Sequence, residues 1–321
     1  MTTPAAAELC TTFGLETPIF QAGMGYVSHG RLAAAVSASG GLGVIATGGD
    51  MTAGTLRNEI QRVRDEAPGR SFGVNLLLPG GASANAVYGS PALVRAQLDT
   101  CYAERVPVVL SGLGDPRPHL PEIHANGSRF VAVVGSLRAA RNVSRAGADA
   151  VVVQGHEAGG HVGPTGTLSL AQAAIREVDA PVLLAGGIAS SEAVDGALAL
   201  GAAGVSVGTR FLASEESDAH VRHKQAVVDA PEDATVVTRA CSGKPSRALR
   251  SPFVESWEGR DGDIRPYLEQ AAEHFWRARA GCVDGHWDEG FFPAGQCSSS
   301  IDAILPAEEI VASLSRHVVA A

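Results

Sequence analysis

Short apolar runs alternate with helical patterns along the first two thirds of the chain, and this alternation limits the fold more than any other feature. Most runs are apolar throughout, as expected of parallel strands buried on both faces. The strand candidates are Thr17–Ala22, Leu42–Ala46, Phe72–Leu77, Val106–Leu110, Arg129–Val134, Ala150–Val153, Pro181–Ala185 and Gly204–Val207. Amphipathic helices are predicted at Gly30–Ser39, Ala53–Glu66, Pro91–Glu104, Ser136–Ala146, Ser169–Val178 and Ser191–Leu200, with a weaker, Pro-interrupted one at Asp115–Ala125. Successive βα units of this kind favour a closed TIM (β/α)8 barrel.

A doubly wound open sheet is the alternative architecture. Its usual fingerprint is GxGxxG directly after the first strand, and the chain lacks it there. The glycine cluster Gly40–Gly43 comes before a strand and therefore fails that test. The barrel is the preferred prediction.

The chain has 321 residues, which leaves room for an extension beyond a barrel of roughly 250 residues. We predict a barrel with the cofactor site over residues 1–229, with Thr209–Asp229 helical. Residues 230–293 are more polar and irregular, and we predict a lid or accessory region that supplies substrate-facing residues and contains a helix at Ile264–Ala280. Residues 294–321 are expected to form a last helix, Ile301–Val319, that packs back on the barrel.

Charge and cysteine content restrict the partners. The net charge is −9 without a run of Lys and Arg, which argues against nucleic acid. No apolar run approaches the roughly 18 residues of a membrane helix, and no signal-peptide pattern opens the chain. The five cysteines are scattered without a CxxC pair, as in reduced cytoplasmic proteins. We therefore expect a cytoplasmic protein with a small-molecule substrate, and a homodimer stays open.

Glycine-rich loops follow several strands, where barrel enzymes carry their active sites. Gly23 and Gly25 flank Met24 after the first strand and would let backbone lie against a planar ligand, although an ordinary tight turn explains them equally well. Asn75 after the third strand could hydrogen-bond a heteroaromatic ring. Ser111 after the fourth could donate to a ring or a phosphate. Each is a weak signal alone.

The loop after the sixth strand, Gln154–Gly163, carries the candidate acid–base group. His161 is the first choice, because an imidazole titrates near neutral pH, and His156 is the second. Glu157 is interpreted as a loop anchor. A zinc motif of the HExxH type is disfavoured, because the two histidines are five residues apart and glycines break the helix it needs, so no metal site is expected.

The loops after the last two strands predict an anion cradle. Gly186 and Gly187 follow the seventh strand, and Gly208 and Thr209 follow the eighth. These loops hold phosphate in many barrels, because backbone N–H groups converge there. Glycines needed only for tight turns are the competing explanation.

These segments together resemble the nitronate monooxygenase (2-nitropropane dioxygenase) family, which is similar in turn to FMN-dependent enoyl-thioester reductases. The matching segments are 18–25, 40–43, 72–75, 155–161, 185–188 and 208–211, in the family's order. The resemblance implies FMN across the barrel mouth, with Gly23 and Met24 against the ring, Asn75 and Gln154 at its polar edge, and His161 as the catalytic residue. The full cofactor-binding set that we expect is Gly23, Met24, Asn75, Ser111, Gln154, Gly155, Ala158, Gly159, Gly160, Gly186, Gly187, Gly208 and Thr209.

Three functions follow as hypotheses. The first is oxidation of alkyl nitronates with O2 to a carbonyl compound and nitrite. The second is reduction of an enoyl thioester, ring enone or quinone, with NAD(P)H as a transient reductant. Many family members carry Pro where Gly23 stands, and Gly also occurs in reductase-like branches, so both stay open. The third is a non-redox phosphate-binding barrel. A nucleotide dehydrogenase would need a Cys in the loop after strand six, which has none.

Overall fold

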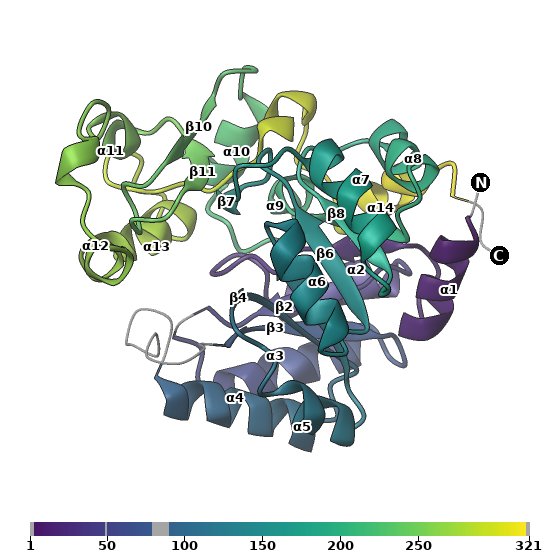
Figure 1. The fold of residues 1–321 in the computed structure, drawn as a ribbon. Helices are drawn as coiled ribbons and strands as arrows, with labels where there is room; N and C mark the ends of the chain where they lie inside the picture. Colours follow the sequence, from purple (N-terminus) through teal and green to yellow (C-terminus); the bar gives the residue numbers. More distant parts are fainter. Residues whose placement is uncertain (1–2, 49, 79–89, 319–321) are drawn as a thin grey trace.

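The predicted barrel is confirmed. The computed structural model describes residues 3–48, 50–78 and 90–318. Eight parallel strands form one sheet in the order β1-β9-β8-β6-β5-β4-β3-β2 (Figure 1). Their bounds are Ile19–Gln21 (β1), Gly43–Ala46 (β2), Phe72–Leu78 (β3), Val108–Gly114 (β4), Arg129–Val134 (β5), Ala150–Gln154 (β6), Val182–Ala185 (β8) and Gly204–Val207 (β9). All eight fall on the strand candidates of the sequence.

Contacts between β1 and the start of β2 close the sheet into a ring. Phe20 and Leu42 form a parallel bridge, and the Gln21 N–H donates to the Leu42 carbonyl at 2.9 Å. The fully buried Gln21 side chain extends this seam, because its Oε1 accepts from the Val44 N–H at 2.8 Å. A side-chain amide thus replaces one ladder bond at the point where the first strand is short.

The strands bury both faces, which explains their uninterrupted apolar sequences. Alternate residues such as Ile45, Val74 and Val151 pack outward under the helices. The residues between them, such as Val44 and Val152, fill the barrel interior. Filling by side chains makes the interior a core and not a pore.

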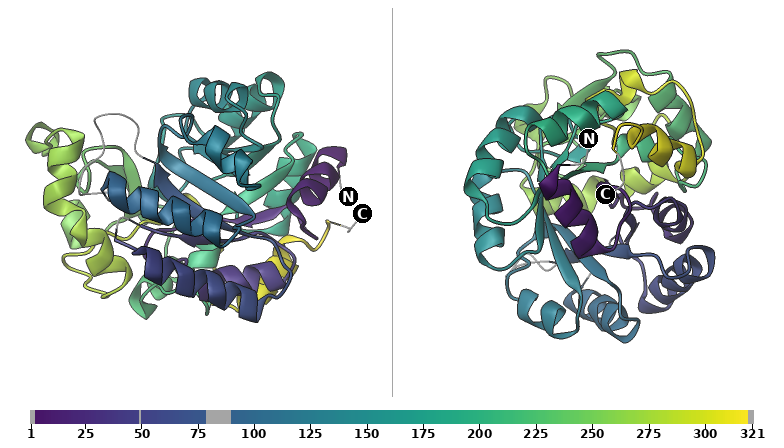
Figure 2. Two further views of the ribbon diagram at one scale, coloured as in Figure 1. Left: turned by 90° about the horizontal axis from the view of Figure 1, so that it is seen from below. Right: turned by 90° about the vertical axis from the view of Figure 1, so that its right-hand side faces the viewer.

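Helix α1 (Pro4–Phe13) closes one end of the barrel and was not predicted from the sequence. Its Leu9 and Phe13 belong to the interior cluster, and Phe13 meets Phe20 edge-on at 5.5 Å. Gly204 lies so close that a Cβ there would come within 2.8 Å of Leu9. Figure 2 shows α1 at the end of the barrel opposite the 230–293 segment.

In the described ranges, seven helices follow strands around the barrel, within a few residues of their predicted bounds except α5. They are α2 (Gly30–Ala38), α3 (Ala53–Glu66), α4 (Pro91–Ala103), α5 (Leu120–Ala125), α6 (Leu137–Arg145), α7 (Thr167–Glu177) and α8 (Ser191–Ala199). Several start at a hydroxyl cap. Thr52, Ser90, Ser136 and Ser190 each accept from an N–H of the first turn, which supplies a partner for an otherwise unbonded donor. No helix in the described part of the chain has the length and apolar character to cross a membrane.

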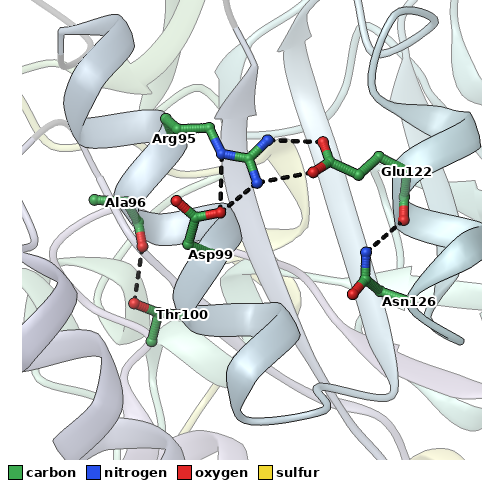
Figure 3. A network of polar contacts seen from close by, with 6 residues as sticks. All are labelled: Arg95, Ala96, Asp99, Thr100, Glu122 and Asn126. Carbon is green, nitrogen blue, oxygen red and sulfur yellow. Dashed lines mark hydrogen bonds and ion pairs between the residues drawn. The ribbon is translucent and has the colours of Figure 1, made fainter.

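A surface network links α4 to α5 (Figure 3). Arg95 donates to both carboxylate oxygens of Glu122, at 2.7 and 2.8 Å, and to Asp99 one turn further along α4. The Arg95 guanidinium lowers the pKa of the Glu122 carboxyl. Because these groups are exposed to solvent, screening keeps the contribution of the network to stability small.

The 230–293 segment builds a small sheet together with the loop after β6. Strands β10 (Thr235–Thr238) and β11 (Ser246–Leu249) are antiparallel, and β11 also pairs with β7 (Gly160–His161). The helical part comprises α11 (Pro252–Glu255), α12 (Tyr267–His274) and α13 (Trp276–Cys282), with a 3-10 turn at Asp261–Asp263. Ala240, Phe253 and Phe291 belong to a separate buried cluster under these helices.

Three helices predicted after the last barrel strand are wrong in extent. Thr209–Asp229 is interrupted between α9 (Thr209–Leu212) and α10 (Val221–Val228), where the Ser214 and Ser217 hydroxyls accept backbone N–H bonds and compete with the helix. The helix expected at Ile264–Ala280 starts only after Pro266 and divides at Phe275. The last helix, expected at Ile301–Val319, is α14 (Ala307–Leu314) and begins after Pro306. Val319 lies outside the described residues.

Candidate active site

A cavity of about 310 Å³ opens at the carboxyl ends of the barrel strands. Ala22, Ala46, Asn75, Gln154 and Ala185 line it from the barrel. The opposite wall comes from residues of the 230–293 segment: Cys241, Ser242, Ser246, Phe275, Ala278, Cys282, Phe291 and Pro293. The volume suits a ligand of cofactor or drug size.

His161 lies on this cavity, held by contacts at its backbone and at its ring. Its backbone pairs with Ser246 of β11, and its carbonyl accepts from the Gln154 side chain at 2.6 Å. Its ring Nε2 lies 2.8 Å from Ser242 Oγ. Contacts from β6, β11 and the loop before β11 therefore fix the orientation of the imidazole.

The site keeps His161 uncharged. Burial and, to a smaller extent, the nearby positive charge of Lys244 lower the pKa of the imidazole to about 4. The Lys244 ammonium in turn lies 3.6 Å from the centre of the Tyr267 ring. A neutral imidazole at pH 7 can accept a proton from a bound substrate or donate a hydrogen bond to it.

Gly186 and Gly187 form one side of the expected anion cradle, and both line the cavity. Their φ angles are +103° and +78°, a backbone conformation that favours glycine. At Gly186 a side chain would also be too close, because a Cβ would come within 2.8 Å of Thr167 Oγ1. Gly208 and Thr209 line the same cavity from the loop after β9, so the structure brings the two predicted loops together.

Several groups at this end of the cavity favour a negative charge at the Cys297 thiol. Burial raises its pKa, but the Thr209 hydroxyl, the Cys297 and Gly187 backbone N–H groups and the Arg210 charge all act in the opposite direction. These groups come from three separate segments and stabilise negative charge near one point. This convergence fits the phosphate of a flavin mononucleotide.

Arg210 adds a buried positive charge beside the cradle. Its Nη2 donates to the carbonyls of Ala213 and Ala303, at 2.7 and 2.6 Å. Among the described residues no carboxylate lies within ion-pair distance of it, and its Nε has no partner. A buried cation paired only with carbonyls favours an anionic ligand nearby.

Gly23, Met24 and Asn75 meet at another part of the cavity wall. A Cβ at Gly23 would lie 2.6 Å from the Asn75 Cβ, so the glycine is needed for close packing against that side chain. The Met24 N–H and carbonyl both bond the Ser28 hydroxyl, which fixes the turn. A planar ring could lie here with Asn75 at its edge.

The other residues predicted in the loop after β6 divide into two groups. Ala158, Gly159 and Gly160 line the cavity together with Gln154. Gly155 and Ser111 do not line it. Gly155 packs against Thr167, where a Cβ would overlap Thr167 Oγ1. Ser111 is buried and donates to the Leu113 carbonyl at 3.2 Å.

The second-choice histidine and the proposed loop anchor have structural partners. His156 Nδ1 bonds the Gly163 carbonyl at 2.9 Å. Glu157 accepts from the backbone N–H and the hydroxyl of Thr167, at 2.8 and 2.9 Å, as expected of an anchor. The Gln296 N–H also donates to the Glu157 carbonyl, which joins this loop to the C-terminal segment.

Sequence reasoning missed Ser242, His223 and Cys297, all of which line the cavity. The contact between His161 and Ser242 spans 81 residues, and no local pattern indicates it. The sequence indicates Ser242 only indirectly, because this residue lies in the 230–293 segment that is predicted to face the substrate.

Comparison with known proteins identifies the family of the chain. The model of a family described as nitronate monooxygenase matches residues 7–317. A probable nitronate monooxygenase from Staphylococcus aureus (strain Newman) is 33% identical over 295 residues, which cover 81% of this chain and 82% of the relative.

Solved structures are also similar to this chain in sequence and fold. FabK from Thermotoga maritima is 38% identical with a TM-score of 0.87, over 97% of this chain and 95% of the other. A nitroalkane oxidase from Streptomyces ansochromogenes is 33% identical with a TM-score of 0.82, over 96% and 97%. An enoyl reductase domain of MlnA from Bacillus amyloliquefaciens, at 11% identity and a TM-score of 0.73, shares the fold.

Proposed function

Because this chain belongs to the nitronate monooxygenase family and is an oxidoreductase of that type, we propose that it binds FMN and oxidises alkyl nitronates with O2. The products are a carbonyl compound and nitrite. The observation that carries the proposal is the position of His161, on the same cavity as the cradle of Gly186, Gly187, Gly208 and Thr209. A group for proton transfer and a site for an anionic cofactor thus face one small space.

The residues of the site have separate roles in this proposal. Gly187, Thr209 and the Arg210 charge would hold the phosphate, and Met24 and Asn75 would contact the ring. The bound flavin would supply the redox chemistry, taking electrons from the substrate and passing them to O2. His161, neutral at pH 7, removes the α-proton of a neutral nitroalkane or donates a hydrogen bond to the bound nitronate.

Anaerobic mixing of the purified protein with a nitronate tests the proposal. We expect the preparation to carry a flavin that is released as FMN, and the visible flavin absorbance to decrease when the nitronate is added without O2. Readmitting O2 should restore the absorbance and release nitrite. A preparation that binds no FMN, or a flavin that the nitronate leaves oxidised, contradicts it.

A different observation favours a second candidate, NAD(P)H-dependent reduction of an enoyl thioester, ring enone or quinone. The chain is 38% identical to FabK, and the segments that resemble nitronate monooxygenases also resemble the enoyl-thioester reductases. In this reaction His161 would protonate or polarise the acceptor. Flavin reduction by NAD(P)H, followed by reoxidation with a crotonyl-type thioester or a quinone, separates it from nitronate oxidation.

A further inference from the structure

His223 has a buried ring nitrogen without a partner, at the wall of the cavity. It lies on α10, is 0% exposed and lines the cavity. Within the described residues its Nδ1 has no hydrogen-bond partner. Buried polar atoms are nearly always bonded, so an unsatisfied one on a cavity wall points to a ligand.

The neighbours of His223 decide which nitrogen carries the proton. Nε2 lies 3.2 Å from the carbonyl oxygen of Pro293, which can only accept, so Nε2 holds the hydrogen and donates it. Nδ1 therefore presents a lone pair. Phe292 meets the imidazole edge-on at 5.2 Å and limits its rotation. Burial lowers the pKa of His223 to about 4, against a smaller opposing effect of the Pro293 carbonyl, so the lone pair is free at neutral pH.

His223 is linked to the cradle through Pro293 and through helix α10. Its partner Pro293 is two residues before Gly295, whose N–H donates to Thr209 Oγ1 at 2.9 Å. Helix α10 also contacts the 3-10 helix Gln296–Ser300, which carries Cys297. A ligand with its phosphate in the cradle would place the adjoining part of its chain near His223.

We propose that His223 is a fixed hydrogen-bond acceptor for a hydroxyl of the polyol chain that joins the flavin ring to its phosphate. This inference rests on the proposed FMN site. The polyol chain follows the phosphate directly and consists of hydroxyl donors, which is the chemistry that an acceptor can recognise. The acceptor thereby favours a hydroxylated chain over a plain alkyl chain of equal length.

Equilibrium titration of flavin-free protein tests this by quenching of flavin fluorescence. The two probes are FMN and an analogue with a phosphopentyl chain, which keeps ring and phosphate but lacks the chain hydroxyls. The wild-type protein should prefer FMN. His223→Phe should reduce that preference about 3- to 10-fold, the effect of one neutral hydrogen bond. His223→Gln, which keeps a donor and an acceptor, should restore part of it.

Tyr102→Phe is the matched control, because the buried Tyr102 hydroxyl also lacks a partner among the described residues but does not line the cavity. It should leave the preference unchanged. An equal preference for FMN in the wild type, His223→Phe and His223→Gln overturns the inference and leaves the FMN site intact. Failure of the wild type to bind either probe overturns the FMN site and this inference together. Thermal unfolding of each variant shows that the affinities refer to folded protein.

Discussion

His161 Nε2 and Ser242 Oγ lie 2.8 Å apart and join the loop after β6 to the 230–293 segment. The serine is 1% exposed and also accepts from the Lys244 N–H at 3.3 Å, so its hydroxyl is fixed on both sides. Ser242 therefore orients the His161 ring, and we predict that it affects catalysis only through His161.

Ser242→Ala should lower kcat/KM about 3- to 10-fold, because one hydrogen bond that orients the imidazole is lost. Flavin affinity should stay within about twofold, since the serine is not part of the cradle. Steady-state kinetics and flavin titration measure the two effects. The matched control is Ser128→Ala, another buried serine, whose hydroxyl donates to the Val106 carbonyl at 2.8 Å outside the cavity. Equal kinetic losses in both variants would show that the effect is only structural.

Stability should fall in mild acid because of His161 and His223. The pKa of each is lowered from 6.5 to about 4 by burial, so the unfolded chain binds these protons first as the pH falls. The stabilisation is present above pH 6.5 and is lost between that value and about pH 4. Each residue should account for on the order of 1–2 kcal/mol between pH 7 and pH 5. Urea unfolding at both pH values should show a smaller drop for His223→Phe than for the wild type, and an identical drop contradicts the assignment.

Gly23→Ala should disturb the ring end of the cavity. Its Cβ would lie 2.6 Å from the Asn75 Cβ, so one of the two must move, at about 1–3 kcal/mol of stability. Flavin binding should weaken with the shift of Asn75. Gly262→Ala in the 3-10 turn Asp261–Asp263 is the control, because a Cβ there has nothing within 4 Å and the residue does not line the cavity. Calorimetry and flavin titration compare the pair, and similar behaviour of both variants contradicts the packing argument.

Gly187→Ala should weaken binding of the phosphate. The residue has φ +78°, so alanine is strained by about 1 kcal/mol and the backbone N–H moves. Affinity for FMN should fall more than affinity for riboflavin, which lacks the phosphate. Gly69→Ala carries nearly the same strain, at φ +75°, with nothing within 4 Å of the new Cβ. Gly69→Ala should lose similar stability without changing the ratio of the FMN and riboflavin affinities. A changed ratio in Gly69→Ala would show that backbone strain alone accounts for the effect of Gly187→Ala.

The barrel could be predicted because its signals are local. A fully apolar run such as Ala150–Val153 identifies a strand buried on both faces without knowledge of its neighbours. The two glycine pairs after β8 and β9 could likewise be placed on one rim, since parallel strands end on the same side. Their approach to one cavity therefore follows from the positions of the two strands in the sequence.

The rest depends on contacts between distant segments. The wall formed by Ser242 and His223 arises where the 230–293 segment and α10 close over the rim, and no periodicity specifies that contact. Helix α1 was missed for the same reason, because its role follows from packing of Leu9 inside the barrel. Ser111 does not line the cavity, and nothing in the sequence shows that its hydroxyl turns to the Leu113 carbonyl.

The pairing of His161 with Ser246 has a consequence for turnover. The residue proposed to transfer protons lies opposite Ser246 of β11, in the segment that helps to cover it, and its ring is hydrogen-bonded to Ser242. If the 230–293 segment moved outward, the His161 imidazole would move away from a ligand bound in the cavity. Substrate entry and proton transfer would then require different conformations, so the open conformation would be inactive.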